Sequence, residues 1–316
     1  MNRDARIYVA GHEGLVGSAV MRRLESEGYH NLVLRTHAEL DLTRQSDVER
    51  FFGAEKPEYV FLCAAKVGGI LANSTYPAEF IYTNIMIAAN VIHSSFLHGV
   101  RRLLNLGSSC IYPRTAPQPL REEYLLTGEL EPTNEPYAIA KIAAIKLCRY
   151  FNIQYGTDFI SLMPTNLYGP NDNFNLETSH VLPALVKRFH DAKALGTPRV
   201  RLWGTGTPRR ELMHVDDLAD ACVYLLRLRS AQEIGEFVNI GVGRDMTIHE
   251  IADMVKSVVG YRGSIEWDRT KPDGTPQKTL CLDKIRSLGW EAKIGLEEGI
   301  SHTYQWYLEN MGSIRE

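Results

Sequence analysis

Three glycines near the N-terminus constrain the fold more than any other feature of the chain. Gly11, Gly14 and Gly17 form a GxxGxxG pattern between the apolar run 6–10 and the segment 15–27, whose apolar residues recur with helical spacing. In such a strand–turn–helix unit, glycine permits a tight turn and lets the backbone approach a pyrophosphate. The free N–H groups and positive dipole of the helix N-terminus stabilise that pyrophosphate. The pattern predicts a dinucleotide-binding turn.

Apolar strands and amphipathic helices continue to alternate up to about residue 165. Strands are expected at 6–10, 32–34, 59–63, 103–107 and 159–163, and helices at 15–27, 79–98 and 137–155. Continuously apolar strands separated by helices are typical of a parallel sheet covered on both faces. We therefore predict an α/β fold with a Rossmann-type doubly wound parallel sheet in residues 1–165.

The alternation weakens after this point. Residues 171–178 are polar and loop-like, and helical patterns at 181–194 and 216–228 are separated by turns rich in proline and glycine. We expect residues 166–316 to form mainly a smaller C-terminal α/β substrate domain, with a segment at about 211–245 returning to the first domain. This second domain should cover the carboxyl ends of the parallel strands, where ligands bind in such sheets.

Charge and hydropathy exclude several classes of protein. The 316 residues include 35 Lys plus Arg against 38 Asp plus Glu, a formal net charge of −3, so we expect no nucleic-acid partner. No run approaches the ~18–20 uninterrupted apolar residues of a membrane helix. Residues 1–6 lead directly into the first strand without a signal-peptide core. We expect a cytoplasmic protein with no membrane partner.

The five cysteines are dispersed and contain no CxxC pair, which fits a reducing compartment and not a disulfide framework or a metal site. Four of them are expected to be buried as small hydrophobic side chains: Cys63, Cys148, Cys222 and Cys281. Cys110 is the exception, because it follows small polar residues at the end of a core strand.

The second strand ends in Arg35, where NAD-binding domains usually carry an acid that binds the ribose hydroxyls. A cation at this position favours the 2′-phosphate of NADP. Glu13, inside the glycine loop, would repel that phosphate if it pointed inward. The sequence favours NADP as the cofactor and leaves its preference over NAD open.

A YxxxK pattern marks the expected chemical centre. Tyr137 and Lys141 share one helix face, where an ammonium lowers the pKa of a phenol toward neutrality and lets it pass a proton to a carbonyl oxygen. Ser108, at the end of the strand 103–107, can donate a hydrogen bond to the same oxygen. Because strand ends hold site residues in this architecture, the three residues together predict a carbonyl reductase set.

The GxxGxxG spacing resembles the extended short-chain dehydrogenase/reductase superfamily, and longer segments resemble the GDP-L-fucose synthase family within it. The likeness runs from Ile7 to about Asn310, and its segments are 64–70, 107–113, 164–170, 179–185, 203–206 and 271–276. The resemblance implies an NADPH-dependent enzyme that converts GDP-4-keto-6-deoxy-D-mannose to GDP-L-fucose. It would epimerise C3 and C5 and then reduce the C4 ketone. It also implies a homodimer formed through the helices at 79–98 and after Tyr137.

Residue roles follow from this resemblance position by position. Cys110 would be the base and His180 the acid of epimerisation, while Ser108, Tyr137 and Lys141 would stabilise the enolate and protonate the alkoxide. The expected substrate contacts are Arg188, Trp203, Arg210 and Asp273. The expected cofactor contacts are Gly11, His12, Glu13, Gly14, Leu15, Val16, Gly17, Arg35, Leu106, Gly107, Ser108, Ser109, Lys141, Pro164, Thr165, Asn166, Leu167 and His180.

Several alternatives stay open. Lys187 and Arg209 adjoin the arginines assigned to the diphosphate, Lys271 and Lys278 could add positive potential there, and His180 could simply cap the following helix. An enzyme acting on another GDP-4-keto sugar would keep the same residues. A nucleotide-sugar 4-epimerase with tightly held NAD would keep the YxxxK pair and Ser108 but would need neither Cys110 nor His180. A non-catalytic binding module would typically lose YxxxK or the glycine loop.

Overall fold

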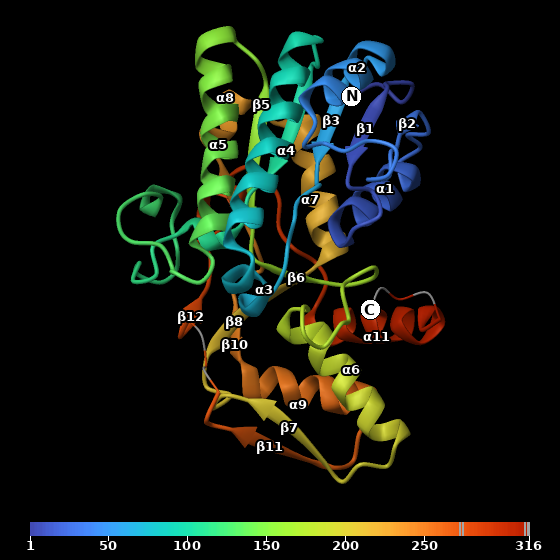
Figure 1. The fold of residues 1–316 in the computed structure, drawn as a ribbon, viewed down its shortest axis with the longest axis vertical. Helices are drawn as coiled ribbons and strands as arrows, with labels where there is room; N and C mark the ends of the chain where they lie inside the picture. Colours follow the sequence, from blue (N-terminus) through green and yellow to red (C-terminus); the bar gives the residue numbers. More distant parts are fainter. Residues whose placement is uncertain (272, 274, 313, 315–316) are drawn as a thin grey trace.

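A six-stranded parallel sheet forms the centre of the molecule. The computed structural model describes residues 1–271, 273, 275–312 and 314 (Figure 1). The strand order is β2-β1-β3-β4-β5-β9, and every neighbouring pair is parallel. The strands are β1 (Ile7–Ala10), β2 (Leu32–Val33), β3 (Tyr59–Leu62), β4 (Arg102–Leu106), β5 (Phe159–Pro164) and β9 (Val238–Ile240). The predicted doubly wound α/β fold is confirmed, and the strand order reverses between β1 and β3.

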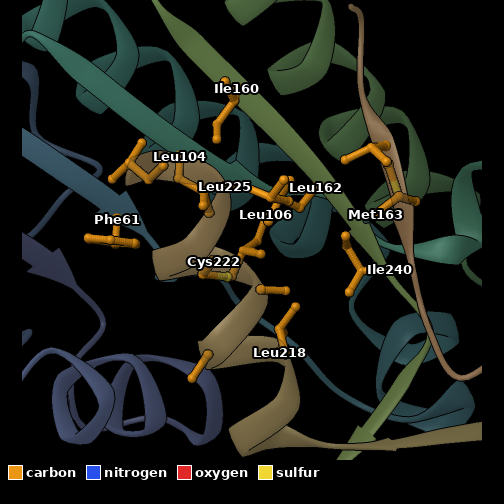
Figure 2. Packing of buried hydrophobic residues seen from close by; sticks show 14 of the residues in the cluster. Phe61, Leu104, Leu106, Ile160, Leu162, Met163, Leu218, Cys222, Leu225 and Ile240 are labelled. Atoms are coloured by element: carbon orange, nitrogen blue, oxygen red, sulfur yellow. The ribbon is translucent and has the colours of Figure 1, made fainter. Parts of the chain in front are cut away.

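Helices cover both faces of this sheet because successive side chains of each strand point to opposite sides. In β1, Ile7 and Val9 belong to one buried cluster, whereas Tyr8 and Ala10 belong to another. The first cluster lies under α1 (Leu15–Ser26) and α7 (Val215–Leu228), and Figure 2 shows α7 packed on the strands. The second lies under α2 (Gln45–Glu55), α4 (Pro77–Leu97) and α5 (Glu135–Tyr155).

Among the residues that the structure describes, one helix, α4, is long and apolar enough to cross a membrane by length and composition alone. This is weak support for a membrane span, since core helices of soluble proteins pass the same test. Here α4 packs between α2 and α5, and residues such as Val91 and Ile92 are fully buried against the sheet.

A second part of the molecule lies below the sheet in the view of Figure 1. Its four-stranded sheet contains β6 (Asn166–Tyr168), β8 (Arg209–His214), β10 (Asp245–Thr247) and β12 (Gln277–Lys278). β7 (Arg199–Trp203) and β11 (Ser264–Asp268) form a separate parallel pair. The helices α6 (Val181–Ala194), α9 (Ile248–Val259) and α11 (Leu296–Asn310) enclose a third buried cluster. The short helices are α3 (Ile70–Thr75), α8 (Ala231–Ile234) and α10 (Asp283–Ser287).

The chain passes repeatedly between the two parts. After β8 it returns as α7 and β9 to the central sheet, and β10 then leaves it again. Residues after β12, including Leu282 and Ile285, pack in the cluster on the α7 face of the central sheet, whereas the following α11 packs in the third cluster. Segments that are distant in sequence therefore alternate between the two parts.

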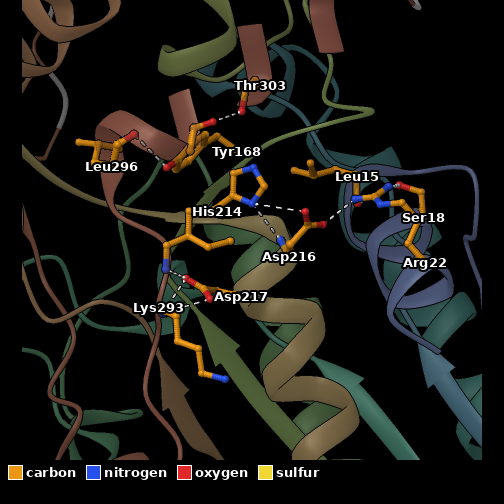
Figure 3. A network of polar contacts seen from close by, with 12 residues as sticks. Leu15, Ser18, Arg22, Tyr168, His214, Asp216, Asp217, Lys293, Leu296 and Thr303 are labelled. Carbon is orange, nitrogen blue, oxygen red and sulfur yellow. Dashed lines mark hydrogen bonds and ion pairs between the residues drawn. The ribbon is translucent and has the colours of Figure 1, made fainter. Parts of the chain in front are cut away.

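A polar network joins helix α1, which follows the glycine loop, to the second part (Figure 3). Arg22 of α1 forms an ion pair with Asp216 at 2.6 Å, and the backbone N–H of Asp216 donates to Nδ1 of the buried His214. Ser18, also on α1, accepts a hydrogen bond from the amide of Asn171 at 3.1 Å. These contacts fix the position of the glycine-loop helix relative to β8 and to the loop after β6.

Candidate active site

The glycine loop opens the N-terminus of α1 toward a ligand. A Cβ on Gly17 would lie 2.1 Å from the carbonyl oxygen of Gly11, and a Cβ on Gly11, whose φ is +81°, would lie 2.8 Å from the backbone of Ala64. These two glycines are required by close packing of backbone. A Cβ on Gly14 would meet nothing nearer than 3.5 Å, and Gly14 is the N-cap of α1 with no side-chain cap bond. The bare Gly14 thus leaves the first N–H groups of α1 accessible to an anion.

A cleft of about 960 Å³ extends from this loop across the carboxyl ends of the parallel strands. Its volume suits a large organic ligand such as a dinucleotide. All the residues predicted to contact the cofactor line it: Gly11, His12, Glu13, Gly14, Leu15, Val16, Gly17, Arg35, Leu106, Gly107, Ser108, Ser109, Lys141, Pro164, Thr165, Asn166, Leu167 and His180. Tyr137 lines it as well. The fold therefore brings one continuous set of side chains and backbone groups to the reversal point of the sheet.

The cleft carries charges of both signs where β2 ends. The Arg35 guanidinium forms an ion pair with Glu55, donates to the carbonyl of Leu34 at 2.7 Å and lies 5.7 Å from the centre of the Phe51 ring. Glu13 lines the same cleft. A cation is available for a phosphate here, but its paired Glu55 carboxylate offsets part of its charge.

The reductase set of Ser108, Tyr137 and Lys141 lies together in the cleft. The Lys141 ammonium donates to the carbonyl of Leu106 at 2.8 Å and lies 5.6 Å from the centre of the Tyr137 ring. Burial lowers the pKa of Lys141 to about 8. The expectation that the ammonium would lower the pKa of Tyr137 is wrong for this structure. Burial raises the pKa of the phenol, and the nearby Cys110 thiol acts in the same direction.

Cys110 lies in a 3₁₀ turn, Ser109–Ile111, directly after β4. Its backbone N–H donates to the Ser108 hydroxyl at 3.4 Å, and its side chain is buried. Cys110 lines a second, small cavity of about 20 Å³ and not the large cleft, and Ser109 lines both. Burial raises the pKa of Cys110, while Lys278, Ser108 and Lys141 oppose the rise.

His180 is the N-cap residue of α6, but its side chain makes no cap hydrogen bond. The alternative that this imidazole caps the helix is therefore wrong. The side chain lies in the large cleft, where the surrounding protein and then the charge of Lys278 lower the pKa of His180. Because Lys278 acts on the pKa of both His180 and Cys110, the two predicted epimerisation residues share one charged neighbour.

The four predicted substrate contacts lie in the second part, outside the described lining of the large cleft. Arg188 is on α6, and the exposed Trp203 ends β7, with the Lys271 ammonium 5.3 Å from its ring centre. Arg210 donates to the carbonyl of Thr275 at 2.6 Å. The Asp273 carboxylate accepts from the backbone N–H of Thr205 at 2.6 Å. Within the segment 271–276, Pro272 and Gly274 are outside the described residues.

Sequence reasoning missed several polar groups. Cys63 is half-buried and lines the large cleft instead of lying in the core. Asp172 lines the same cleft with a buried carboxylate oxygen that lacks a hydrogen-bond partner, and burial raises its pKa to about 7. Asn134, beside Cys110 in the small cavity, has a buried amide oxygen without a partner. The residue types alone gave no signal, since Asp and Asn are common in polar loops.

Comparisons with known proteins agree with this architecture. The sequence profile of the NAD dependent epimerase/dehydratase family matches residues 7–241. GDP-L-fucose synthase 1 of Arabidopsis thaliana is 62% identical over 310 residues, which cover 98% of this chain and 95% of the relative. GDP-L-fucose synthase of Escherichia coli K12 is 53% identical and covers 98% of each chain. The solved structure of a GDP-mannoheptose C4 reductase from Campylobacter jejuni with NADP bound is 43% identical with a TM-score of 0.92, covering 98% of this chain and 99% of that one.

Proposed function

Because the chain belongs to the NAD dependent epimerase/dehydratase family, and within it to the GDP-L-fucose synthases, we propose that it converts GDP-4-keto-6-deoxy-D-mannose to GDP-L-fucose. The reaction is C3 and C5 epimerisation followed by NADPH-dependent reduction of the C4 ketone. One observation carries this proposal. The reductase set lines one cleft with His180, while Cys110 lies two residues beyond Ser108 in the same turn.

The glycine loop supports a nicotinamide cofactor, for which NADPH is proposed. The N–H groups of α1 would hold the pyrophosphate, and Arg35 would exchange part of its pairing with Glu55 for the 2′-phosphate. When bound, NADPH supplies the hydride for the C4 carbon. The carboxyl ends of β4 and β5, with Gly107 and Pro164, would form the floor of the nicotinamide end of the cleft.

Epimerisation requires a base on one face of the sugar and an acid on the other. Protons on C3 and C5 are acidic because the adjacent C4 ketone delocalises the resulting negative charge onto its oxygen. The Cys110 thiolate would take such a proton, and His180 would return one to the opposite face. Ser108 and Tyr137 would donate hydrogen bonds to the oxygen at C4 and stabilise the enolate.

The same oxygen is then protonated during reduction. Tyr137 would give its phenolic proton to the C4 alkoxide, and the Lys141 ammonium beside its ring would stabilise the phenolate that remains. The carbonyl of Leu106 orients that ammonium. One oxygen-binding pair therefore serves both half-reactions.

We propose that the predicted substrate contacts in the second part of the molecule bind the GDP moiety. Arg188 and Arg210 would pair with the diphosphate, Trp203 would offer an aromatic surface, and Asp273 would bind hydroxyl groups. The related GDP-mannoheptose C4 reductase favours a second candidate, a reductase acting on another GDP-4-keto sugar.

We also propose that the protein is a cytoplasmic homodimer. Helices α4 and α5 pack side by side and expose large apolar residues: Tyr82, Leu97, Tyr150, Ile153 and Tyr155. A second copy of the same two helices would cover this surface. All five cysteines are free thiols, as suits a reducing compartment.

The test combines purified protein with GDP-4-keto-6-deoxy-D-mannose and NADPH, with absorbance at 340 nm followed and the product examined by proton NMR. NADPH oxidation with inversion at C3 and C5 supports the proposal. Cys110→Ser and His180→Gln should abolish inversion while the ketone-reducing residues remain. An uninverted product from the wild-type protein would show that it is a C4 reductase without epimerase activity. If no NADPH is oxidised, the substrate is more consistent with another GDP-4-keto sugar.

A further inference from the structure

The short strand β12 presents Lys278 toward Cys110. The side chains of Gln277 and Thr279 both donate to the same oxygen of Asp245, so they lie on one face of the strand. Because side chains alternate along a strand, Lys278 lies on the opposite face. Lys278 and Cys110 line the same small cavity of about 20 Å³. Two segments far apart in sequence thus bring a lysine and a cysteine to one small cavity.

The backbone around Lys278 is held from two sides. Its strand pairs with β8, and the backbone N–H of Leu280 donates to the fully buried Glu211 carboxylate at 2.7 Å. On the other side, the N–H of Thr279 donates to the Gln118 side chain at 3.0 Å, and the Thr279 carbonyl accepts from Leu120. Gln118 and Leu120 belong to the loop that follows Cys110 and line the same cavity. Lys278 is therefore positioned relative to Cys110 by the fold itself.

The charges around Lys278 come from each element packed against it. Burial lowers the pKa of Lys278 and the charge of Arg210 adds to this fall, whereas Cys110 and Glu131 oppose it. Within the described part of the chain, no carboxylate forms an ion pair with the Lys278 ammonium, so it is available to a thiolate. Lys278 lowers the pKa of Cys110 more strongly than Lys141 does, and the Lys141 ammonium is already bonded to the carbonyl of Leu106.

We propose that Lys278 is the counterion of the Cys110 thiolate, and hence a positioning residue that acts through Cys110 in proton abstraction but not in ketone reduction. This inference rests on the proposed epimerase function. The two lysines of the site would have separate roles: Lys141 would stabilise the Tyr137 phenolate, and Lys278 would stabilise the Cys110 thiolate. The pairing also neutralises the charge of Lys278. Without it, that charge would disfavour the protonated imidazole of His180, which is the form that donates a proton.

The first test is a pH titration of the thiolate by its absorbance at 240 nm. Each spectrum is referred to the matched Cys110→Ser protein, so that only this thiol contributes. Lys278→Met keeps most of the aliphatic stem, removes the charge and should raise the Cys110 midpoint by about one unit or more, a tenfold loss of thiolate at neutral pH. Lys278→Arg should keep the midpoint near that of the wild type. An unchanged midpoint in Lys278→Met would overturn the proposal.

Lys293→Met is the matched control. It removes a lysine whose side chain is 76% exposed and is paired with Asp220, away from both cavities, so the Cys110 midpoint should stay unchanged. A shift of equal size in this control would show that net charge alone moves the midpoint and would refute a specific Lys278 effect.

A second measurement separates this proposal from the proposed function. In D₂O without NADPH, exchange of the C3 and C5 protons of the keto sugar reports proton abstraction alone. Lys278→Met should slow exchange at least tenfold at neutral pH and recover as pH rises, whereas a merely structural loss would not recover. If the wild-type protein exchanges nothing, the epimerase function fails, while the 240 nm titration still decides whether Lys278 stabilises the thiolate.

Discussion

Adding one methyl group should reduce the stability of the protein at Gly17 but reduce nucleotide binding at Gly14. In Gly17→Ala the new Cβ would lie 2.1 Å from the Gly11 carbonyl oxygen, so the backbone must move by about 1.3 Å to reach the 3.4 Å of a tolerable contact. In Gly14→Ala the nearest atom is 3.5 Å away, and no movement is needed. The first change disturbs the fold of the free protein, whereas the second places a methyl group where a phosphate would approach the helix.

Overpacking costs about 1–3 kcal/mol where side chains adapt, and the atoms struck by Gly17→Ala are backbone, so the upper end applies. Alanine regains about 1 kcal/mol over glycine inside a helix. We expect a net loss of about 2 kcal/mol, or about 4 °C in Tm for a chain of this size. Gly14→Ala should lower Tm by no more than about 2 °C, because alanine is a poorer N-cap than glycine by roughly 0.5–1 kcal/mol but meets no steric clash.

The assay pairs thermal unfolding by circular dichroism, without cofactor, with NADPH and NADH binding followed by fluorescence. Gly14→Ala should weaken binding of both nucleotides at least tenfold, or about 1.4 kcal/mol, with nearly wild-type Tm. Wild-type affinity in Gly14→Ala would refute the placement of the pyrophosphate, and an unchanged Tm in Gly17→Ala would refute the packing argument.

Three further outcomes are expected. The rate of ketone reduction, followed at 340 nm, should fall as pH rises through about 8, because Lys141 loses its proton there. Lys141→Met should lose most of the activity, and the remaining rate should no longer fall at this pH. Burial raises the pKa of Asp172 to about 7, so the folded protein binds this proton more tightly than the unfolded chain and loses stability as pH rises from about 4 to 7. Asp172→Asn should therefore raise the urea midpoint of unfolding at pH 8 and have little effect at pH 4. Equal effects at both pH values would contradict burial of the charge. Tyr150→Glu combined with Ile153→Glu should halve the mass by light scattering without changing the circular dichroism spectrum, whereas a retained dimer would place the interface elsewhere.

The central sheet was predictable because its strands are short continuous apolar runs and its helices carry regular apolar faces. The expected strand 159–163 and helix 181–194 agree closely with β5 and α6. The second sheet was not predictable, since strands such as β6 and β12 have two or three residues and acquire their pairing from β8, far away in the chain.

The candidate site likewise has a part that the sequence predicts and a part that it does not. Most of the cofactor contacts converge because they follow the ends of parallel strands, which the sequence marks with small residues. The sequence indicated Lys278 only as a possible source of positive potential, and its proximity to Cys110 could not be predicted because it depends on how β12 docks between β8 and the loop 118–120. The pKa of Tyr137 was misjudged because a sequence pattern shows a neighbouring charge but not the depth of burial.

The repeated passage of the chain between the two parts limits how such a protein can be recombined with its relatives. A chimera that takes its sugar-binding half from another enzyme cannot be made with a single crossover at residue 165, because α7, β9 and the residues around Leu282 would come from the donor while their packing partners would not. Substrate range in this architecture should therefore change through substitutions and loop exchanges within the second part, with the segments that return to the central sheet left intact.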